Sequence, residues 1–281
     1  MKKLPTFEEL QRPLPQFSPK NWYYAATRIM LNTAGNLSDG IRLGNTYGFD
    51  SGVMLDYVYK NRASGKLLMG KLIDRAYLNT VGWRGIRLRK ILVKQFIHRA
   101  LTKQLQHKSL ARYLDIACGG GEYDLEVLKD FDQASVHAEL RDYKKENLER
   151  ARQNARQHQL EALIFRQADA FDDQNYHEKW DLAIASGFWE IIADDSLIRK
   201  CMQNLASCLV SGGTLIFTIQ PYHPQLEFIA RALKSNTGKP WVMRLRSLEL
   251  FKAWLDEFGF RFIAHKMEEN EIFGVVETER R

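Results

Sequence analysis

The spacing of apolar residues changes near residue 109. Before this point they recur every three to four positions over 22–31, 51–60, 66–78 and about 85–106, which is the period of a helix with one buried face. Glycines between these segments predict turns. We therefore expect residues 1–109 to form a helical cap or lid region made of short helices.

After residue 109, short apolar runs alternate with helical segments. Strands are predicted at 111–116, 135–140, 163–166, 181–185, 214–219, 260–265 and 272–277, with helices beginning near Glu122, Lys144 and Ser196. This alternation is typical of a doubly wound parallel sheet. Only "KMEENE" separates the last two strands, so they form a hairpin and one strand runs antiparallel. We predict an α/β domain over 110–281 with a Rossmann-like, seven-stranded sheet.

Length and cysteine content favour an ordinary globular protein in the cytoplasm. No segment has the apolar length of a membrane-spanning helix, and the first 20 residues lack the apolar core of a secretory signal. The three cysteines form neither a CxxC pair nor a Cys/His cluster. We expect no disulfide framework and no metal site.

The net charge of +7 is concentrated in one stretch. Residues 75–114 contain ten Lys or Arg and no Asp or Glu, and their apolar residues have helical spacing. This pattern predicts a basic amphipathic helix, and two interpretations remain open. Its charged side is either the solvated face of a core helix, or a surface for an anionic membrane or partner. The second interpretation would make the protein peripheral to the inner membrane surface.

The segment "YLDIACGGGEYDLEVL" (113–128) places glycines at the first turn from strand to helix. In a doubly wound sheet this turn lies beside the ligand. Gly119 and Gly121 match the first two glycines of a dinucleotide fingerprint, but Asp124 stands in place of the third. A carboxylate in the first helical turn disfavours a diphosphate by charge repulsion. We therefore expect an adenosine cofactor that carries no phosphate.

The same residues resemble the glycine-rich motif of class I S-adenosylmethionine-dependent methyltransferases. Ala117 stands where that motif has its first glycine, and it is still a small residue. The resemblance implies S-adenosyl-L-methionine as the cofactor. It also implies that Gly119 and Gly121 lie against the methionine portion, with Asp115 placed to orient the ammonium group.

Further acids follow in the order that this class shows. Asp142 follows the second strand, where a carboxylate can accept hydrogen bonds from ribose hydroxyls, and Tyr143 lies beside it. Glu139 is the alternative acid, but it lies within the strand pattern. For any one acid taken alone, a solvated turn residue or helix cap is the commoner explanation.

The resemblance also implies contacts after the third and fourth strands. Asp169 would accept from the adenine amino group, Ala170 and Phe171 would flank the ring, and Ser186 would face the reacting sulfonium. Five elements in the expected order make a chance match an unconvincing explanation.

Longer segments resemble a narrower family of bacterial methyltransferases. They include "SDGIRLGNTYGFDSGVMLDYVYKN", "SGFWEI" and "QPYHPQLEFIARAL", and the resemblance reaches from Ser38 to the C-terminus. In some members such a domain follows an α/β-hydrolase-like domain. This chain has no G-x-S-x-G nucleophile elbow, so we expect no hydrolase activity in it. The association suggests a lipid or acyl compound as methyl acceptor.

Candidate catalytic residues follow the fourth and fifth strands. His223, held between prolines, is predicted to act as general base or to orient the acceptor, with Tyr222 beside it. The alternative is that His223 only hydrogen-bonds a neighbouring loop backbone. Glu190 could orient the acceptor or face the sulfonium.

Two residues of the helical region are predicted to help bind the donor. Arg84 could pair with the donor's carboxylate, and Tyr57 lies on a helical face that could cover the donor. The alternative for both is packing within the cap.

Three functions remain open. The leading one is an S-adenosylmethionine-dependent methyltransferase that acts on a small or lipid-like acceptor. A nucleic-acid methyltransferase is the second, although the chain shows no recognisable RNA-binding module and no base-flipping tetrapeptide. The third is a donor-binding protein without catalysis that docks on a membrane or partner through the basic helix.

Overall fold

The computed structural model describes residues 4–281, which divide into two compact units. The helical unit comprises the described residues up to Arg87 together with Tyr222–Leu245, and the sheet unit comprises Leu88–Pro221 with Arg246–Arg281. This division differs from a boundary at residue 109, because helix α6 (Val81–Leu105) runs through both units and residues 222–245 return to the helical one.

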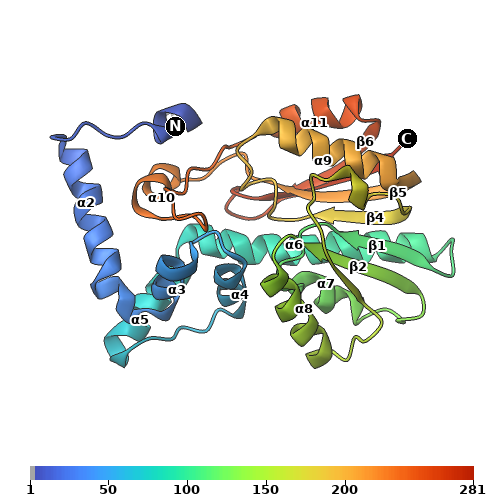
Figure 1. Ribbon diagram of the computed structural model, residues 1–281, viewed down its shortest axis with the longest axis horizontal. Helices are drawn as coiled ribbons and strands as arrows, with labels where there is room; N and C mark the ends of the chain where they lie inside the picture. The colour runs from blue at the N-terminus through green and yellow to red at the C-terminus, as the bar shows by residue number, and fades with distance from the viewer. Residues whose placement is uncertain (1–3) are drawn as a thin grey trace. The chain divides into compact units, whose positions relative to one another are not determined.

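The sheet unit contains a seven-stranded sheet in the order β3-β2-β1-β4-β5-β7-β6 (Figure 1). Its strands are β1 (Ala111–Asp115), β2 (Val136–Asp142), β3 (Ile164–Gln167), β4 (Trp180–Ala185), β5 (Leu209–Ile219), β6 (Phe260–Met267) and β7 (Gly274–Arg280). Strands β1 to β5 pair in parallel, whereas β7 is antiparallel to both β5 and β6. The predicted Rossmann-like sheet with one antiparallel strand is confirmed.

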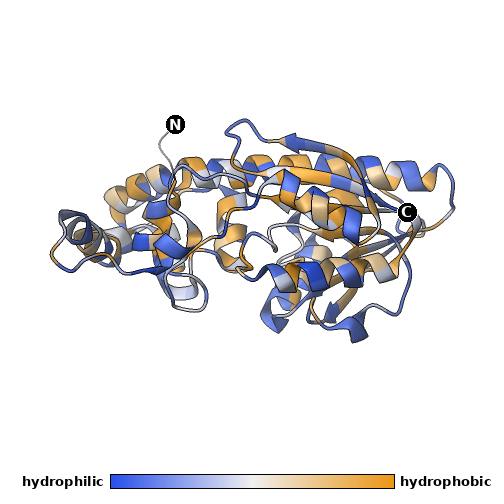
Figure 2. Ribbon diagram, turned by 90° about the horizontal axis from the view of Figure 1, so that it is seen from above, coloured by the Kyte–Doolittle hydropathy of each residue, from blue (hydrophilic) through white to orange (hydrophobic). Residues whose placement is uncertain are grey.

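Each face of the sheet has its own apolar core. Helices α7 (Glu122–Leu128), α8 (Lys145–Gln157) and the second part of α6 cover one face, and α9 (Asp195–Cys208) and α11 (Leu248–Glu257) cover the other. Successive strand residues point to opposite faces, so Tyr113 joins the first core and Leu114 the second. Figure 2 shows apolar and polar residues alternating along α6, as a one-sided core helix requires. Because β1 to β5 run parallel, their carboxyl ends and the loops after them lie at one edge of the sheet.

The basic residues of α6 contact acids on neighbouring elements of the sheet unit. Lys90 Nζ lies 2.7 Å from Glu126 Oε1 on α7, and Lys94 Nζ lies 2.7 Å from Glu126 Oε2. Further along the helix, Arg99 pairs with Glu277 on β7. These basic residues therefore form ion pairs with acids that lie far away in the sequence. This favours the interpretation of a core helix whose charged side contacts acids of the protein.

The helical unit is built from short helices. They are α1 (Phe7–Gln11), α2 (Pro19–Asn32), the 3-10 helix η1 (Ala34–Leu37), α3 (Asp39–Tyr47), α4 (Gly52–Lys60), α5 (Leu67–Leu78), the start of α6, and α10 (Leu226–Ala232). Helix α3 packs against α4 and α5, and α10 packs against α1 and α2. Within the described residues, no helix combines the length and the apolar character needed to cross a membrane.

The buried carboxylate of Asp74 on α5 holds this unit together. Its Oδ1 accepts from the Ser38 hydroxyl at 2.6 Å and from Gly40 N at 2.8 Å. Its Oδ2 accepts from the Tyr57 hydroxyl at 2.5 Å and from Ser64 N at 2.9 Å. A fully buried carboxylate needs such donors to offset its desolvation. The four hydrogen bonds join α3, α4, α5 and the loop between α4 and α5.

Candidate functional site

The glycine loop after β1 turns sharply because two of its residues have left-handed backbones. Gly119 has φ +59° and Gly121, which caps α7, has φ +71°. A Cβ built at Gly119 would meet no atom within 4 Å, so this glycine lines open space in front of the sheet edge. At Gly121 it would lie 3.5 Å from Ala151 Cβ and Leu140 Cδ1. Gly119 therefore lines a cradle, while Gly121 serves packing and the turn.

Asp142 at the end of β2 holds this loop in place. Its Oδ2 accepts from Gly119 N at 3.0 Å, and its Oδ1 accepts from Lys144 N at 2.8 Å and Asn147 Nδ2 at 2.9 Å. The loop is also tied to β2 by Cys118 N, which donates to the Arg141 carbonyl at 2.8 Å. The carboxylate thus lies directly beside the glycine cradle.

Glu139, the alternative acid, has a different environment. It is fully buried in β2, where Arg141 Nε lies 2.5 Å and Arg166 Nε 2.8 Å from its Oε1. These two guanidinium groups occupy the carboxylate within the sheet. Its contacts favour Asp142 as the acid available to a ligand.

A buried pair of acids lies beneath the loop. Asp115 Oδ1 accepts from Ala117 N at 2.8 Å and its Oδ2 accepts from the Tyr123 hydroxyl at 2.6 Å, while Tyr113 donates to Asp124. Burial raises the pKa of Asp115 to about 7, although these hydrogen bonds oppose the rise. Burial and the neighbouring Asp115 charge raise the pKa of Asp124 well above its ordinary value. The pair therefore favours a proton on Asp124.

The structure gives Asp124 a different environment from the one that the sequence predicts. The sequence predicts a charged carboxylate in the first turn of the helix, where it would repel a diphosphate. The side chain is instead fully buried, and its raised pKa favours the neutral form. Asp124 stands in place of the third glycine of a dinucleotide fingerprint. Because its side chain is buried and favours the neutral form, its charge does not exclude a diphosphate.

The loop after β3 presents Asp169 and two apolar residues. Asp169 is exposed, and its Oδ1 accepts from Phe171 N at 2.9 Å, which forms a tight turn. Ala170 is buried, and Phe171 stacks on Phe188 with ring centroids 5.4 Å apart. Tyr143, in the loop after β2, leaves 68% of its surface exposed. These side chains have the apolar faces and the acceptor that an adenine ring would use.

The loop after β4 carries a further buried acid, Glu190. Ser186 is buried at the strand end, and Gly187 N donates to Thr218 Oγ1 at 2.7 Å. Glu190 is only 8% exposed, and its Oε1 lies 3.3 Å from Arg89 Nη1 on α6. Among the described residues, Glu190 Oε2 has no hydrogen-bond partner. A buried carboxylate oxygen without a donor is rare in folded proteins and is available to a ligand.

Arg89 and Arg246 are site-forming residues that the sequence reasoning missed. Arg246 Nη1 donates to the Trp189 carbonyl at 3.1 Å and its Nη2 donates to the Ile192 carbonyl at 2.7 Å, so it shapes the loop that carries Glu190. Both guanidinium groups are buried. The sequence carries no local signal for these contacts, because 101 residues separate Arg89 from Glu190.

The remaining candidates belong to the helical unit. His223 is buried and its Nδ1 accepts from Gln225 N at 3.0 Å, which is the loop-backbone contact considered as the alternative from the sequence. Burial lowers the pKa of His223 to about 4, so the ring is neutral near pH 7.

Tyr222 is partly exposed and Arg84 is exposed. Tyr57 donates to Asp74, and burial raises its pKa. Donor or acceptor contacts of His223 and of these three candidates stay predictions.

No group of three or more His, Cys, Asp or Glu suited to a metal ion occurs among residues 4–281. The three cysteines are buried and free. The site is thus made of the glycine loop, Asp142, the loop after β3 and the Glu190 loop.

Comparisons with known proteins agree with this architecture. The family profile described as "Putative methyltransferase" matches residues 2–280. The uncharacterized protein YnbC of Escherichia coli (strain K12) is 38% identical over 275 aligned residues, and the match covers 96% of this chain and 46% of that protein. The chain therefore spans about half the length of this relative.

Two solved structures are similar in fold. A possible exported protein from Bordetella parapertussis has a TM-score of 0.69 and 18% identity, with 94% of this chain and 99% of that chain covered. Magnesium protoporphyrin IX methyltransferase from Synechocystis PCC 6803, with bound SAH, has a TM-score of 0.59 and 15% identity, with 92% and 99% covered. At these identities the likeness concerns the fold alone.

Proposed function

The chain belongs to this methyltransferase family, and we propose that it transfers a methyl group from S-adenosyl-L-methionine to a small or lipid-like acceptor. The observation that carries the proposal is the cradle at Gly119. Its amide is bound by Asp142 Oδ2, and the space that its missing side chain leaves is open. Such a cradle accommodates a ligand in direct contact with the backbone.

The residues around this loop fit an adenosyl cofactor. Asp142 would accept from the ribose hydroxyls while it keeps the loop in place, and Tyr143 offers an exposed aromatic face beside it. Asp169 would accept from the adenine amino group, with Ala170 and Phe171 against the ring. Asp115, with Ala117 N bound to its Oδ1, would favour a positively charged ammonium near the loop.

The chain's own groups would position the methyl acceptor. When bound, S-adenosyl-L-methionine would supply a methyl group on a positively charged sulfur, which would leave as a neutral thioether. Positioning and exclusion of water then account for much of the rate. Glu190 Oε2 would accept a hydrogen bond from the acceptor, and Arg89 would hold the carboxylate in place. Ser186 lies at the end of β4, close in sequence to this loop.

His223 would act as a hydrogen-bond donor more readily than as a general base. Its Nδ1 accepts from Gln225 N, so the neutral ring carries its proton on Nε2, an assignment inferred from that hydrogen bond. A donor at Nε2 can orient an acceptor oxygen. Tyr222 would contribute a second polar group next to it. A nucleic-acid acceptor has less support, because Lys90, Lys94 and Arg99 of the basic helix pair with acids of the protein.

Calorimetric titration with S-adenosyl-L-methionine and with its demethylated product tests donor binding. We expect both to bind, and the absence of heat for both ligands would overturn the proposal. Turnover is tested by incubating cell extracts with the protein and a donor that carries an isotopically labelled methyl group, followed by mass spectrometry. Donor binding without any labelled product across lipid and small-molecule fractions would favour the non-catalytic alternative.

A further inference from the structure

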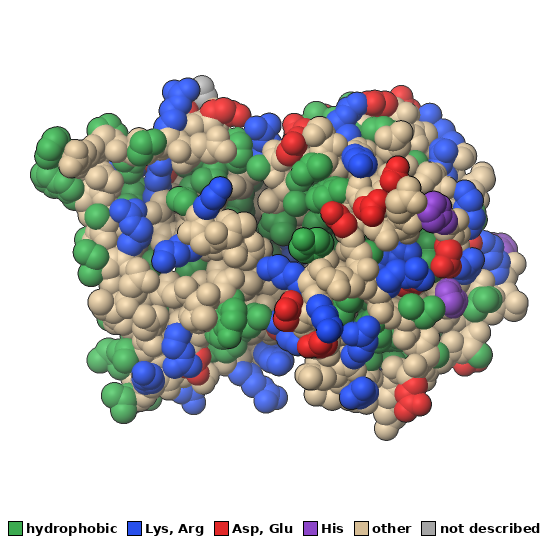
Figure 3. Space-filling view, viewed as in Figure 1, with side chains coloured by type: hydrophobic (Ala, Val, Ile, Leu, Met, Phe, Trp, Pro, Cys, Tyr) green, Lys and Arg blue, Asp and Glu red, His purple; other side chains and the backbone are tan. Residues whose placement is uncertain are grey.

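Helix α5 exposes apolar side chains in its first two turns. Leu67 and Leu68 leave 83% and 74% of their surface exposed, and Met69 and Leu72 are also exposed. Figure 3 shows hydrophobic side chains over α2 and α5 of the helical unit, with Lys and Arg nearby. Contiguous exposed apolar residues of this size mark interaction surfaces more often than chance exposure does.

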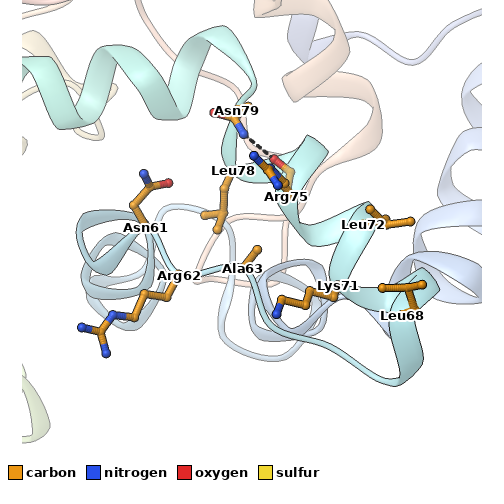
Figure 4. Close-up of a pocket in the computed structure, with 9 residues that line it drawn as sticks. All are labelled: Asn61, Arg62, Ala63, Leu68, Lys71, Leu72, Arg75, Leu78 and Asn79. Atoms are coloured by element: carbon orange, nitrogen blue, oxygen red, sulfur yellow. Dashed lines mark hydrogen bonds between the residues drawn. The ribbon is translucent and has the colours of Figure 1, made fainter.

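A basic cavity adjoins these residues. It has a volume of about 570 Å³ and is lined by Asn61, Arg62, Ala63, Leu68, Lys71, Leu72, Arg75, Leu78 and Asn79. Figure 4 shows Lys71 extending from α5 toward Ala63, and Arg75 beside Asn79. Three cations and no acid line the cavity, and Leu68 and Leu72 belong to both the cavity and the exposed apolar surface. The cavity thus joins positive charge to apolar surface.

The cations of this cavity differ from those of α6. Arg62, Lys71 and Arg75 form no ion pair with any residue in the described part of the chain, whereas Lys90 and Lys94 pair with Glu126. Asp74 is the only acid between residues 57 and 114, and it is fully buried with four hydrogen-bond donors. No acid from this segment neutralises the exposed cations.

We propose that this α5 surface, made of Arg62, Leu67, Leu68, Met69, Lys71, Leu72 and Arg75, docks on a bilayer that contains anionic phospholipid. The cations would contact lipid phosphates while the leucines and Met69 enter the acyl boundary, as in other interfacial helices. Lys and Arg side chains suit the boundary between headgroups and acyl chains. Their charged ends can reach the headgroups while their methylene groups contact the acyl chains. This inference goes beyond methyl transfer and does not depend on it.

Sedimentation of the full chain with vesicles tests the proposal. We expect binding to vesicles of phosphatidylcholine mixed with phosphatidylglycerol, weak binding to phosphatidylcholine alone, and a decrease with added salt. Each cation at an anionic surface strengthens binding about 5-fold, so Lys71→Gln with Arg75→Gln should weaken it about 30-fold. Leu68→Ser with Leu72→Ser should weaken it as well, because less apolar surface enters the bilayer.

Lys200→Gln with Arg156→Gln is the matched control, since both residues are exposed cations of the sheet unit. This control should bind as the unmodified chain does. A Leu68→Trp variant should show a blue-shifted emission on the anionic vesicles. Failure of the unmodified chain to bind them, equal losses in the control, or a concentration-dependent dimer that the leucine variant abolishes would each overturn the proposal.

Discussion

The carboxylate of Asp142 accepts a hydrogen bond from the backbone amide of Gly119 at 3.0 Å. The acid at the end of β2 and the glycine turn after β1 therefore form one structural element, although 23 residues separate them. A change in either residue should alter the position of the other. This coupling makes donor affinity sensitive to both.

Replacing Asp142 should weaken donor binding strongly. In Asp142→Asn one charged acceptor is lost, and hydrogen bonds to charged groups contribute about 1.5–3 kcal/mol each. We expect donor affinity to fall about 10- to 100-fold in calorimetry. Glu139→Gln is the control: it should lower the free energy of unfolding, because Arg141 and Arg166 lose a buried partner, yet the folded variant should bind the donor normally. The reverse pattern would make Glu139 the ribose-binding acid.

A comparison of Gly119→Ala with Gly212→Ala should separate the effect of backbone strain on stability from the effect of a side chain on donor binding. Gly119 has φ +59° and Gly212 has φ +76°, and a Cβ at either position would meet no atom within 4 Å. Both alanine variants should lose about 1–2 kcal/mol of stability, because a left-handed backbone disfavours Cβ. Only Gly119→Ala should also weaken donor binding, by about tenfold or more, since its methyl group enters the cradle. Equal donor affinities in the two variants would place the ligand elsewhere.

The sheet was predictable because its strands carry buried apolar runs that can be read locally. Strand β4 was expected at 181–185 and is found at Trp180–Ala185. Strand β5 begins at Leu209, five residues before the expected start, but its pairing with β4 shifts register before Thr214, where Gly212 has φ +76°. Helix α11 was not predicted, although Ser247 caps it and Phe251, Trp254 and Leu255 form its buried face.

Site residues that lie at the ends of strands could be predicted from the sequence, because the strands themselves could be predicted. The glycine loop follows β1, Asp142 is the last residue of β2 and Asp169 lies just after β3, so the sheet sets their positions. Contacts between distant segments could not be predicted in this way. The pairing of Arg89 with Glu190 depends on how α6 packs against the sheet, and no periodic pattern in the sequence carries that information.

The buried acid Asp115 should make stability depend on pH. Its pKa is about 7 in the folded protein, against about 4 when it is exposed. Between these values the unfolded chain has lost a proton that the folded protein keeps, so this group lowers the free energy of unfolding as pH rises from about 4 to about 7. Urea unfolding at pH 5 and pH 8 should show that Asp115→Asn gains stability relative to the unmodified protein at the higher pH, by on the order of a few kcal/mol.

Asp130→Asn is the control for this titration, because Asp130 is an exposed carboxylate of the same unit. Substitution of this exposed side chain should change the free energy of unfolding little at either pH value. If Asp115→Asn also shows a constant difference, then Asp115 is ionised throughout this range and the acid pair does not hold its proton as described.

His223 offers two substitutions that separate its two ring nitrogens. Asn places an amide oxygen near the position of Nδ1 and can still accept from Gln225 N, whereas Gln places its amide near Nε2. If Nε2 orients the methyl acceptor, then His223→Gln should keep more of the turnover than His223→Asn. His223→Asn should in turn keep more stability, by about 1 kcal/mol, because the loop hydrogen bond is preserved.

The pH dependence of stability gives a check on His223 that needs no substrate. Because burial holds its pKa at about 4, the folded protein remains neutral at this site where the unfolded chain takes up a proton, near pH 6.5. The free energy of unfolding should therefore fall as pH decreases from about 6.5 to about 4, and His223→Asn should lack this loss. If His223 only accepts the hydrogen bond from Gln225 N, the dependence of stability on pH would be the same. In that case His223→Gln and His223→Asn would turn over substrate equally well.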